Sequence, residues 1–354
     1  MVARMAGIVI VRTGGEIGIK SKPVRRSYEQ LILKSIKTRM KTASLPYSKI
    51  WRIAGRIYIE CEDAPGMAKN LSRIFGVSST SAGISSPSDL RTIVDIGAKM
   101  ASETFRPGTF AIRCRRIGEQ GYSSQDVCRR LGNAILSAGI PLSVDLEKPD
   151  QVLHIEIRDD LAVTYSGEHR GPDGFPLGAQ GPVVGVVDGT PESLLASWTM
   201  MKRGSDLRAA SPATEDGASG PDLSAERNLR LLAAWKPGCC IRTSVYQIPE
   251  GMVGAERDLF LLSAAATMAS RRGMEAVVSG LSPSLRSLKA FNVLPVYPLF
   301  PLLAIDQNLA AHWATVVGID EKGPFCRPLE AAGPPLLEKI RLHPEPALEL
   351  TVKA

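Results

Sequence analysis

The sequence has no pair of cysteines in the spacing C-x-x-C, and its four histidines are scattered along the chain. Zinc sites are usually built from closely spaced pairs of such ligands, so neither a zinc site nor another metal site is expected. The six cysteines are Cys61, Cys114, Cys128, Cys239, Cys240 and Cys326. We expect most of them to be reduced thiols in the cytosol.

The chain also lacks any run of about 18 apolar residues, so no membrane-spanning helix is predicted. The apolar run at residues 8–11 is shorter than the core of a signal peptide and is followed by Arg12 and two glycines. We interpret it as a strand and expect a cytoplasmic protein without a membrane partner. A length of 354 residues predicts two or three domains.

Acidic residues are scarce at the start of the chain. The first 59 residues contain 13 Lys and Arg but only Glu16 and Glu29, a net charge of +11, whereas the whole chain carries +7. Such concentrated positive charge is typical of proteins that bind the phosphate backbone of nucleic acids. A solvated surface is the plain alternative and an anionic membrane a weaker one, but the density of charge favours nucleic acid.

Hydrophobic periodicity predicts α+β structure followed by α/β structure. Apolar residues at helical spacing, among them Val24, predict a helix over residues 24–41, with Arg39 and other basic residues on its remaining faces. With strands at 8–12 and 56–61, this forms an α+β unit at residues 1–62. A second α+β domain is predicted at 63–167 and a linker at 168–179. Alternating strands and helices predict a doubly wound parallel sheet at 180–354.

Several segments resemble, in the same order, those of the tRNA 4-thiouridine synthetases, or tRNA sulfurtransferases. They are residues 12–20, 57–60, 71–77, 110–116, 146–150, 171–178 and 198–204. The resemblance implies a ferredoxin-like domain at 1–62, a THUMP domain at 63–167 and a PP-loop domain at 180–354. It implies that the first two bind tRNA, and that the third uses ATP to adenylate a uridine before sulfur displaces AMP. Some members also supply sulfur for thiamine synthesis.

The resemblance also locates the residues that would hold the nucleotide. The family's SGGxDS loop corresponds to residues 188–193, which read DGTPES. Its glycines let backbone N–H groups surround a pyrophosphate, whereas here Thr190 adds a Cβ and Pro191 removes a donor. We therefore expect a loop too altered for uridine adenylation, with ATP and Mg²⁺ as cofactors only if it still works. The nucleotide positions by motif are Val186, Val187, Gly189, Glu192, Ser193 and Gly280.

Sulfur and RNA chemistry point to two further groups of residues. Cys326 stands where the family has its sulfur-handling cysteine, and it is either a persulfide carrier that attacks as the thiolate or a plain loop cysteine. Archaeal-type members of the family carry C-x-x-C just ahead of the helix predicted at 259–271, whereas residues 254–257 here contain no cysteine, so no iron–sulfur cluster is expected. Phosphate contacts are expected from Lys20, Arg25, Arg26, Lys34, Lys37, Arg113, Arg115 and Arg116.

Two functions remain open at this point. In the first, the chain is a tRNA-binding protein whose PP-loop domain has become a scaffold, acting alone or beside an active partner enzyme. In the second, it is an active tRNA sulfurtransferase that makes 4-thiouridine with sulfur from a donor protein. A homodimer is compatible with both. Binding of ATP distinguishes them, because only the enzyme requires it.

Overall fold

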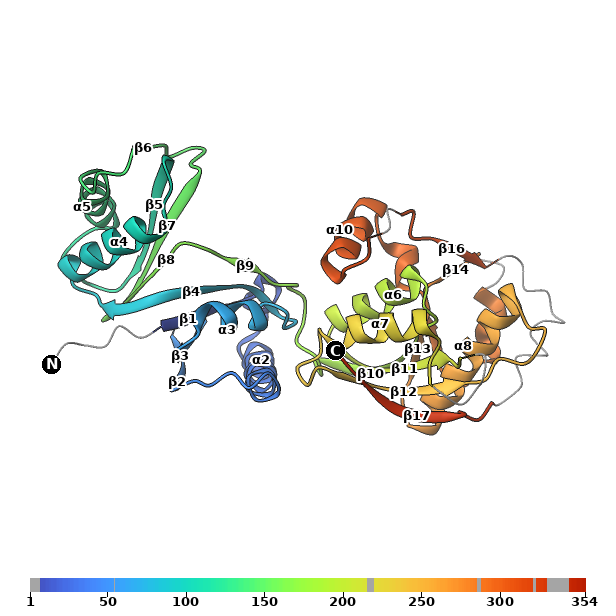
Figure 1. Cartoon of the computed structure of the whole chain (residues 1–354). Helices are drawn as coiled ribbons and strands as arrows, with labels where there is room; N and C mark the ends of the chain where they lie inside the picture. The colour runs from blue at the N-terminus through green and yellow to red at the C-terminus, as the bar shows by residue number, and fades with distance from the viewer. Residues whose placement is uncertain (1–6, 54, 215–219, 285–287, 321–322, 330–343) are drawn as a thin grey trace. The chain divides into compact units, whose positions relative to one another are not determined.

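The computed structural model describes residues 7–53, 55–214, 220–284, 288–320, 323–329 and 344–354. The chain forms two compact units (Figure 1). The N-terminal unit consists of Met1–Ile19, Ala43–Arg73 and Val77–Asp173. The C-terminal unit consists of Lys20–Thr42, Ile74–Gly76 and Gly174–Ala354.

The N-terminal unit is built on one nine-stranded sheet in the order β2-β3-β1-β4-β8-β7-β5-β6, with β9 beside β4. Only the β5–β6 and β5–β7 pairs are parallel. The strands are β1 (Gly7–Thr13), β2 (Lys49–Ile53), β3 (Arg56–Cys61), β4 (Val77–Pro87), β5 (Gly108–Ile117), β6 (Leu142–Val144), β7 (Gln151–Arg158), β8 (Leu161–Tyr165) and β9 (His169–Arg170). The helices are α1 (Gly15–Gly18), α3 (Ala64–Leu71), α4 (Leu90–Thr104) and α5 (Ser124–Leu136).

The sheet continues across the boundary that the sequence places at residues 62 and 63. β1 pairs on one edge with β3 and on the other with β4, from Gly7↔Ile84 to Thr13↔Val77. The strands of both expected α+β domains therefore share one sheet. Helices α4 and α5 cover the second half of this sheet. The core between them includes Leu131 of α5, Phe110 of β5 and Leu153 of β7.

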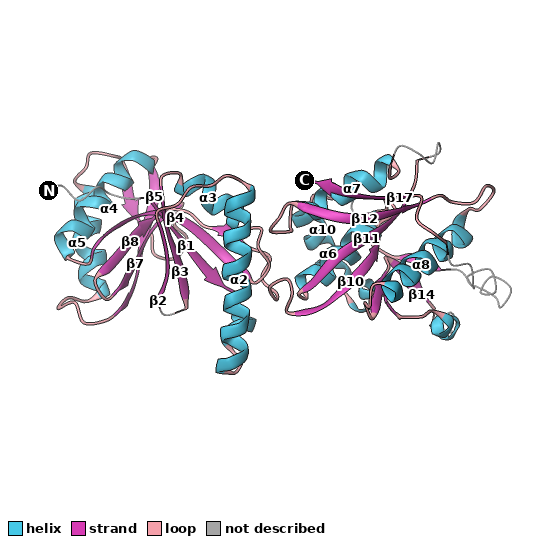
Figure 2. Cartoon of the chain, turned by 90° about the horizontal axis from the view of Figure 1, so that it is seen from below, coloured by secondary structure: helices cyan, strands magenta, loops and turns pink. Residues whose placement is uncertain are grey.

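The C-terminal unit contains a doubly wound sheet, as the sequence predicts (Figure 2). Its order is β15-β13-β10-β11-β12-β17, and every pair is parallel except that of β12 with β17. The strands are β10 (Gln180–Val186), β11 (Ser205–Pro212), β12 (Cys240–Tyr246), β13 (Ala276–Val278), β15 (Tyr297–Leu299) and β17 (Leu348–Lys353), and a separate pair is formed by β14 (Leu281–Pro283) and β16 (Arg327–Leu329). The helices are α6 (Pro191–Lys202), α7 (Leu223–Ala233), α8 (Gly254–Arg271) and α10 (Gln307–Val317), with 3-10 turns at Lys289–Val293 and Pro301–Ala304.

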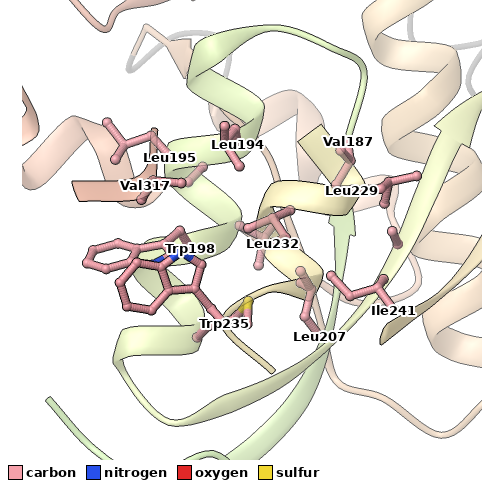
Figure 3. Packing of buried hydrophobic residues seen from close by; sticks show 14 of the residues in the cluster. Val187, Leu194, Leu195, Trp198, Leu207, Leu229, Leu232, Trp235, Ile241 and Val317 are labelled. Atoms are coloured by element: carbon pink, nitrogen blue, oxygen red, sulfur yellow. The ribbon is translucent and has the colours of Figure 1, made fainter. Parts of the chain in front are cut away.

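The two faces of this sheet have separate cores. On one face, α6, α7 and α10 bury Trp198, Leu232 and Val317 against Leu207 and Ile241 (Figure 3). On the other face, α8 packs its apolar side chains against Val184, Val186 and Ala210. The alternation of side chains along β10 and β11 sends neighbouring residues into different cores, which fixes the register of both strands.

Helix α2 (Lys22–Thr42) forms as predicted, but its contacts place it in the C-terminal unit. The Tyr28 ring lies 5.5 Å from the Phe175 ring, centroid to centroid. Two expectations for this helix are wrong. Val24, expected to face inward, is 39% exposed, and Arg39, expected on a solvent face, is only 3% exposed.

Several elements were not predicted, among them β2, β11 and α10. In β11 the sequence SDLRAASP places Asp206 and Arg208 between buried residues. The segment therefore shows neither a continuous apolar run nor a clear strand alternation. It becomes a central strand because β10 and β12 pair with both of its edges.

Candidate nucleic-acid interface and phosphate loop

The loop between β10 and α6 lies at the carboxyl end of the parallel sheet. The next strand in sequence, β11, pairs with one edge of β10, and the later strand β13 pairs with the other. In open α/β sheets, ligands bind where the strand order reverses in this way. The fold therefore makes this loop, together with residues 279–280 after β13, the expected ligand site.

Asp188 is the central side chain of the loop. It is buried, and its Oδ1 accepts hydrogen bonds from the Thr190 backbone N–H (3.1 Å) and hydroxyl (2.7 Å). Its Oδ2 accepts a hydrogen bond from Nη1 of Arg327. The carboxylate is thus directed into the protein and is bonded on both oxygens.

Arg327 joins this loop to helix α8. Its Nη2 donates to Oδ1 of Asp258 at 2.6 Å, while its Nη1 bonds Asp188. The arginine begins β16, which pairs with β14 directly after Gly280. One guanidinium therefore bridges two largely buried carboxylates, and it holds three segments of the unit together at the carboxyl end of the sheet.

The electrostatics of the bridge differ at its two ends. Burial would raise the pKa of Asp188, but the charge of Arg327 and the bonds from Thr190 outweigh burial and lower it. Burial also raises the pKa of Asp258, and there the attraction of Arg327 does not overcome it. Burial would lower the pKa of Arg327, but the two carboxylates raise it. The guanidinium is therefore always charged and fully engaged.

The loop also uses its own backbone donors. Asp188 N–H donates to Oγ of Ser193 (3.3 Å), and Ser193 N–H donates to the Thr190 hydroxyl (3.2 Å), which caps α6. Pro191 has no N–H, and the Thr190 N–H is bonded to Asp188. In this arrangement the backbone N–H groups of Asp188, Thr190 and Ser193 are not free to bind a phosphate.

Two glycines are required by the packing of the loop. Gly189 has φ of +92°, and a Cβ there would lie 2.1 Å from Oγ of Ser224. A Cβ on Gly280 would lie 2.5 Å from the backbone carbon of Glu192. These glycines allow the first turns of α6 and α7 to approach the loop closely.

The remaining positions that the family motifs indicate differ in burial and in the element that carries them. Val187 and Val186 point into the cores on opposite faces of the sheet. Glu192 and Ser193 lie in the first turn of α6. Cys326 is exposed and directly precedes Arg327. The structure thus brings Cys326 and the nucleotide positions to one end of the sheet, through the bridge that Arg327 forms.

The basic residues expected to contact RNA fall into two groups. On α2, Arg26, Lys34 and Lys37 are exposed and Arg25 is half-buried. The Nζ of Lys20 lies 5.3 Å from the centre of the Phe175 ring, so the Lys20 ammonium group already makes a cation–π contact.

Arg39 of α2 has an internal role. Its guanidinium donates to Sγ of Cys239 (2.9 Å) and to the carbonyls of Ala234 (2.8 Å) and Lys236 (2.9 Å). These carbonyls follow the carboxyl end of α7, where a cation stabilises the exposed ends of the helix dipole. Periodicity cannot separate such a buried arginine from the solvent-facing lysines beside it.

The three arginines of β5 differ in their availability. Arg116 donates to the carbonyl of Gly118 (2.8 Å) and to Oε1 of Gln120 (2.7 Å), so it is used structurally. Arg113 donates to the carbonyl of Leu146 at 2.5 Å. Arg115 is exposed and has no ion-pair partner in the described part of the chain. Of the three, Arg115 is best placed for a phosphate.

A buried ion cluster, which the sequence did not predict, lies on the face of the N-terminal sheet opposite helices α4 and α5. Glu156 of β7 is 4% exposed and contacts Arg12 (3.5 Å), Arg56 (3.3 Å) and Arg158 (2.8 Å). Three strands separate β3, which carries Arg56, from β7. Since neighbouring strands lie about 4.8 Å apart, this contact requires the sheet to curve, with this face on the inside.

The cluster predicts how stability depends on pH. Burial would raise the pKa of Glu156, but the hydrogen bond from Arg158 and the charges of Arg56 and Arg12 lower it below the ordinary 4.5. A carboxyl with a lowered pKa in the folded state stabilises that state at pH values above 4.5, and the contribution is lost as the pH falls through the lowered pKa. We expect acid unfolding of the N-terminal unit below pH 4.5 to occur at a higher pH in Glu156→Gln than in the wild type, measured by circular dichroism. An unchanged acid transition would contradict this assignment.

A hollow of the C-terminal unit lies far from the loop along the strands. Its volume is about 910 Å³, and it lies at the amino ends of β10 and β13, where Gln180, Glu275 and Trp313 line it. The loop at residues 188–193 lies at the opposite ends of these strands.

Within the described residues, no helix is long and apolar enough to cross a membrane, and no cluster of His, Cys, Asp and Glu could hold a metal ion.

Comparisons with known proteins agree with this architecture. Residues 8–81 match the ThiI ferredoxin-like domain and residues 87–165 match the THUMP domain. A probable tRNA sulfurtransferase of Methanosarcina acetivorans is 37% identical over 253 residues, which are 69% of this chain and 60% of the relative. One from Saccharolobus solfataricus is 35% identical over 237 residues, or 65% of this chain and 60% of the relative. The chain thus spans about 60% of the length of these curated relatives.

Two solved structures share the fold. PH1313 from Pyrococcus horikoshii superposes with a TM-score of 0.69 and 24% identity, covering 88% of this chain and 99% of that protein. A 4-thiouridine synthetase in complex with RNA and ATP gives a TM-score of 0.74 and 21% identity, covering 95% and 94% of the two chains. At these identities the likeness concerns the fold.

Proposed function

We propose that this chain, which carries a ThiI ferredoxin-like domain and a THUMP domain and is similar to probable tRNA sulfurtransferases, is a member of their family. In this proposal it binds tRNA through residues 8–165 and does not adenylate uridine at the loop after β10. In this function the C-terminal unit is a scaffold, and the chemistry belongs to a partner enzyme. The proposed site of action is the cytoplasm, where its RNA ligand is found.

The charge of the N-terminal half supports binding of tRNA. Of the residues expected to contact RNA, Arg26, Lys34, Lys37 and Arg115 are exposed. Exposed basic side chains bind the phosphate backbone by releasing counterions, and such binding weakens steeply with salt. The curated relatives are named as probable tRNA sulfurtransferases, and we therefore propose tRNA as the nucleic acid.

One observation carries the second half of the proposal, namely the bridge from Arg327 to Asp188 and Asp258. A loop that binds a triphosphate needs free N–H donors and uncompensated positive charge. Here three N–H groups are bonded within the loop, a fourth position is proline and has none, and the guanidinium is neutralised by two carboxylates. These residues do not fit ATP and Mg²⁺, so we derive no adenylation step.

Binding of a tRNA transcript tests the first half. We expect binding whose affinity falls linearly with salt concentration on logarithmic scales. The triple variant Arg26→Ala/Lys34→Ala/Lys37→Ala is expected to lower the slope by up to about three, roughly one for each phosphate contact. Filter binding at several salt concentrations measures this slope. The matched control is Arg227→Ala/Arg230→Ala, at two exposed positions of α7. If the triple variant binds like that control, α2 is not the RNA surface.

Titration with ATP and Mg²⁺ tests the second half. We expect no heat of binding at millimolar ATP, with or without tRNA, and no release of AMP. The alternative function is an active tRNA sulfurtransferase, which the exposed thiol of Cys326 beside the loop favours. In that case AMP would form only when tRNA is present, and Cys326→Ser would abolish transfer of sulfur from a donor protein, to tRNA or toward thiamine synthesis.

A further inference from the structure

Three arginines converge on a small hollow of the C-terminal unit, away from the loop at residues 188–193. Arg208 of β11 and Arg242 of β12 line the hollow, which has a volume of about 190 Å³. Arg272, which follows α8, reaches Glu349 on the same wall. Arg208 and Arg242 lie in the amino-terminal halves of their strands, whereas the loop lies at the carboxyl end of β10.

The alternation of the strands directs these side chains to one face. Leu207, Ala209 and Ile241 point into the core beneath α6 and α7. The residues between them therefore point to the α8 face, where Met268 and Thr351 complete the lining. The hollow is built by a rigid sheet and one helix, and its shape does not depend on a mobile loop.

Two arginines and one glutamate line this hollow, and Arg272, which lies outside the lining, pairs with the glutamate. Its one acidic lining residue is Glu349, which accepts hydrogen bonds from Arg272 and from Oγ of Ser244 (3.1 Å). The neighbouring Arg271 is already paired with Glu345 at 2.6 Å. Within the described residues, neither Arg208 nor Arg242 has an ion-pair partner. Two guanidinium groups thus line the hollow without an ion-pair contact, although Glu349 and Asp206 attract Arg208 from a greater distance.

The chemistry of the lining selects an oxyanion. Burial lowers the pKa of Arg208, and the like charges of Arg242 and Arg272 lower it further, so an anion bound in the hollow would relieve repulsion among these cations. Planar guanidinium groups bind phosphate through pairs of parallel hydrogen bonds, and the hydroxyl group of Thr351 in the lining is a further possible donor. The volume is several times the ~30 Å³ of one water molecule, which leaves room for a tetrahedral anion.

We propose that the hollow between Arg208, Arg242 and Arg272 is a binding site for a phosphate group. The phosphate belongs either to a free phosphorylated molecule or to an RNA backbone. This proposal does not depend on binding of tRNA by residues 8–165, because a free phosphate would occupy the same hollow.

Calorimetric titration of the full chain with inorganic phosphate, in a chloride buffer of constant ionic strength, tests the site. We expect saturable binding, and a loss of about tenfold or more in affinity in both Arg208→Ala and Arg242→Ala, since a hydrogen bond to a charged group is worth at least that factor. Glu349→Gln removes the negative charge and is expected to bind phosphate about threefold more tightly. This gain cannot arise from misfolding. Arg230→Ala, whose partner is Glu226, should bind like the wild type.

The salt dependence of tRNA binding separates the two sources of phosphate. If Arg208→Ala/Arg242→Ala lowers the slope by about two, the site takes an RNA phosphate. If the slope is unchanged while phosphate still binds the wild type, the site takes a free phosphorylated molecule. If inorganic phosphate gives no saturable heat, or if Glu349→Gln and Arg242→Ala shift its affinity in the same direction, the assignment is wrong.

Discussion

Replacing Glu156 with glutamine is expected to lower the free energy of unfolding of the N-terminal unit by about 3–5 kcal/mol. The amide keeps the shape of the side chain but removes the buried charge that pairs with Arg12, Arg56 and Arg158. Arg12 keeps its longer ion pair with the more exposed Glu168, at 3.8 Å. Arg12 and Arg158 are themselves buried, at 9% and 7% exposure. A buried cation that loses its partner keeps its full desolvation cost, so the loss greatly exceeds that of a surface ion pair.

Urea unfolding monitored by two signals measures this loss. Circular dichroism reports both units. Three of the four tryptophans, Trp198, Trp235 and Trp313, lie in the C-terminal unit, whereas Trp51 lies in the N-terminal unit. Fluorescence is therefore measured in a Trp51→Phe background, in which it reports the C-terminal unit. We expect Glu156→Gln to shift the dichroism transition of the N-terminal unit and to leave the fluorescence transition in place. Glu119→Gln, at an exposed position, should change stability by less than about 0.5 kcal/mol. If both variants change the free energy of unfolding by the same amount, the buried cluster contributes no more to stability than an exposed carboxylate does.

Replacing Arg327 with alanine is expected to destabilise the C-terminal unit by a similar ~3–5 kcal/mol. The variant leaves Asp188 and Asp258 close together and largely buried, with no cation between them. It also releases β16 from the loop after β10, because the guanidinium is the link between the two. Tryptophan fluorescence in urea measures the loss directly, since the tryptophans of this unit form part of its core.

A matched variant separates the ion bridge from the packing around it. Asp188→Asn/Arg327→Met/Asp258→Asn removes all three charges at similar volume, and such replacements of complete buried networks are often close to neutral. We expect the triple variant to be more stable than Arg327→Ala alone. If the triple variant is the less stable of the two, the bridge stabilises the unit through charge itself and not by compensating buried carboxylates.

Much of the fold follows from patterns within single segments. The helical spacing of Ile32, Ile36 and Met40 predicts α2, and the apolar run at 183–187 predicts a buried parallel strand. Both signals are local, because burial of one face or of both faces repeats with the period of the element. β11 carries no such signal, since Asp206 and Arg208 interrupt its apolar residues. Its place in the sheet depends on pairing with β10 and β12.

The candidate site divides in the same way. The sequence predicts an altered loop at Thr190 and Pro191, because the chemistry of a missing N–H or an added Cβ is local. The partner of Asp188 cannot be recognised, since Arg327 lies 139 positions away and enters the site through the pairing of β14 with β16. The same limit applies to Arg39, which periodicity assigns to solvent and which instead caps α7.

The sequence by itself therefore determined the fold class, many of the helices and strands, and the basic first half, since each depends on residues close together in the chain. Tertiary structure alone decided which charges meet. It brought three arginines to Glu156 through the curvature of one sheet, Arg327 to two carboxylates, and Arg208 to Arg242 across neighbouring strands. Coulomb interactions depend on distance in space and on burial, and neither is written in the spacing of residues along a chain.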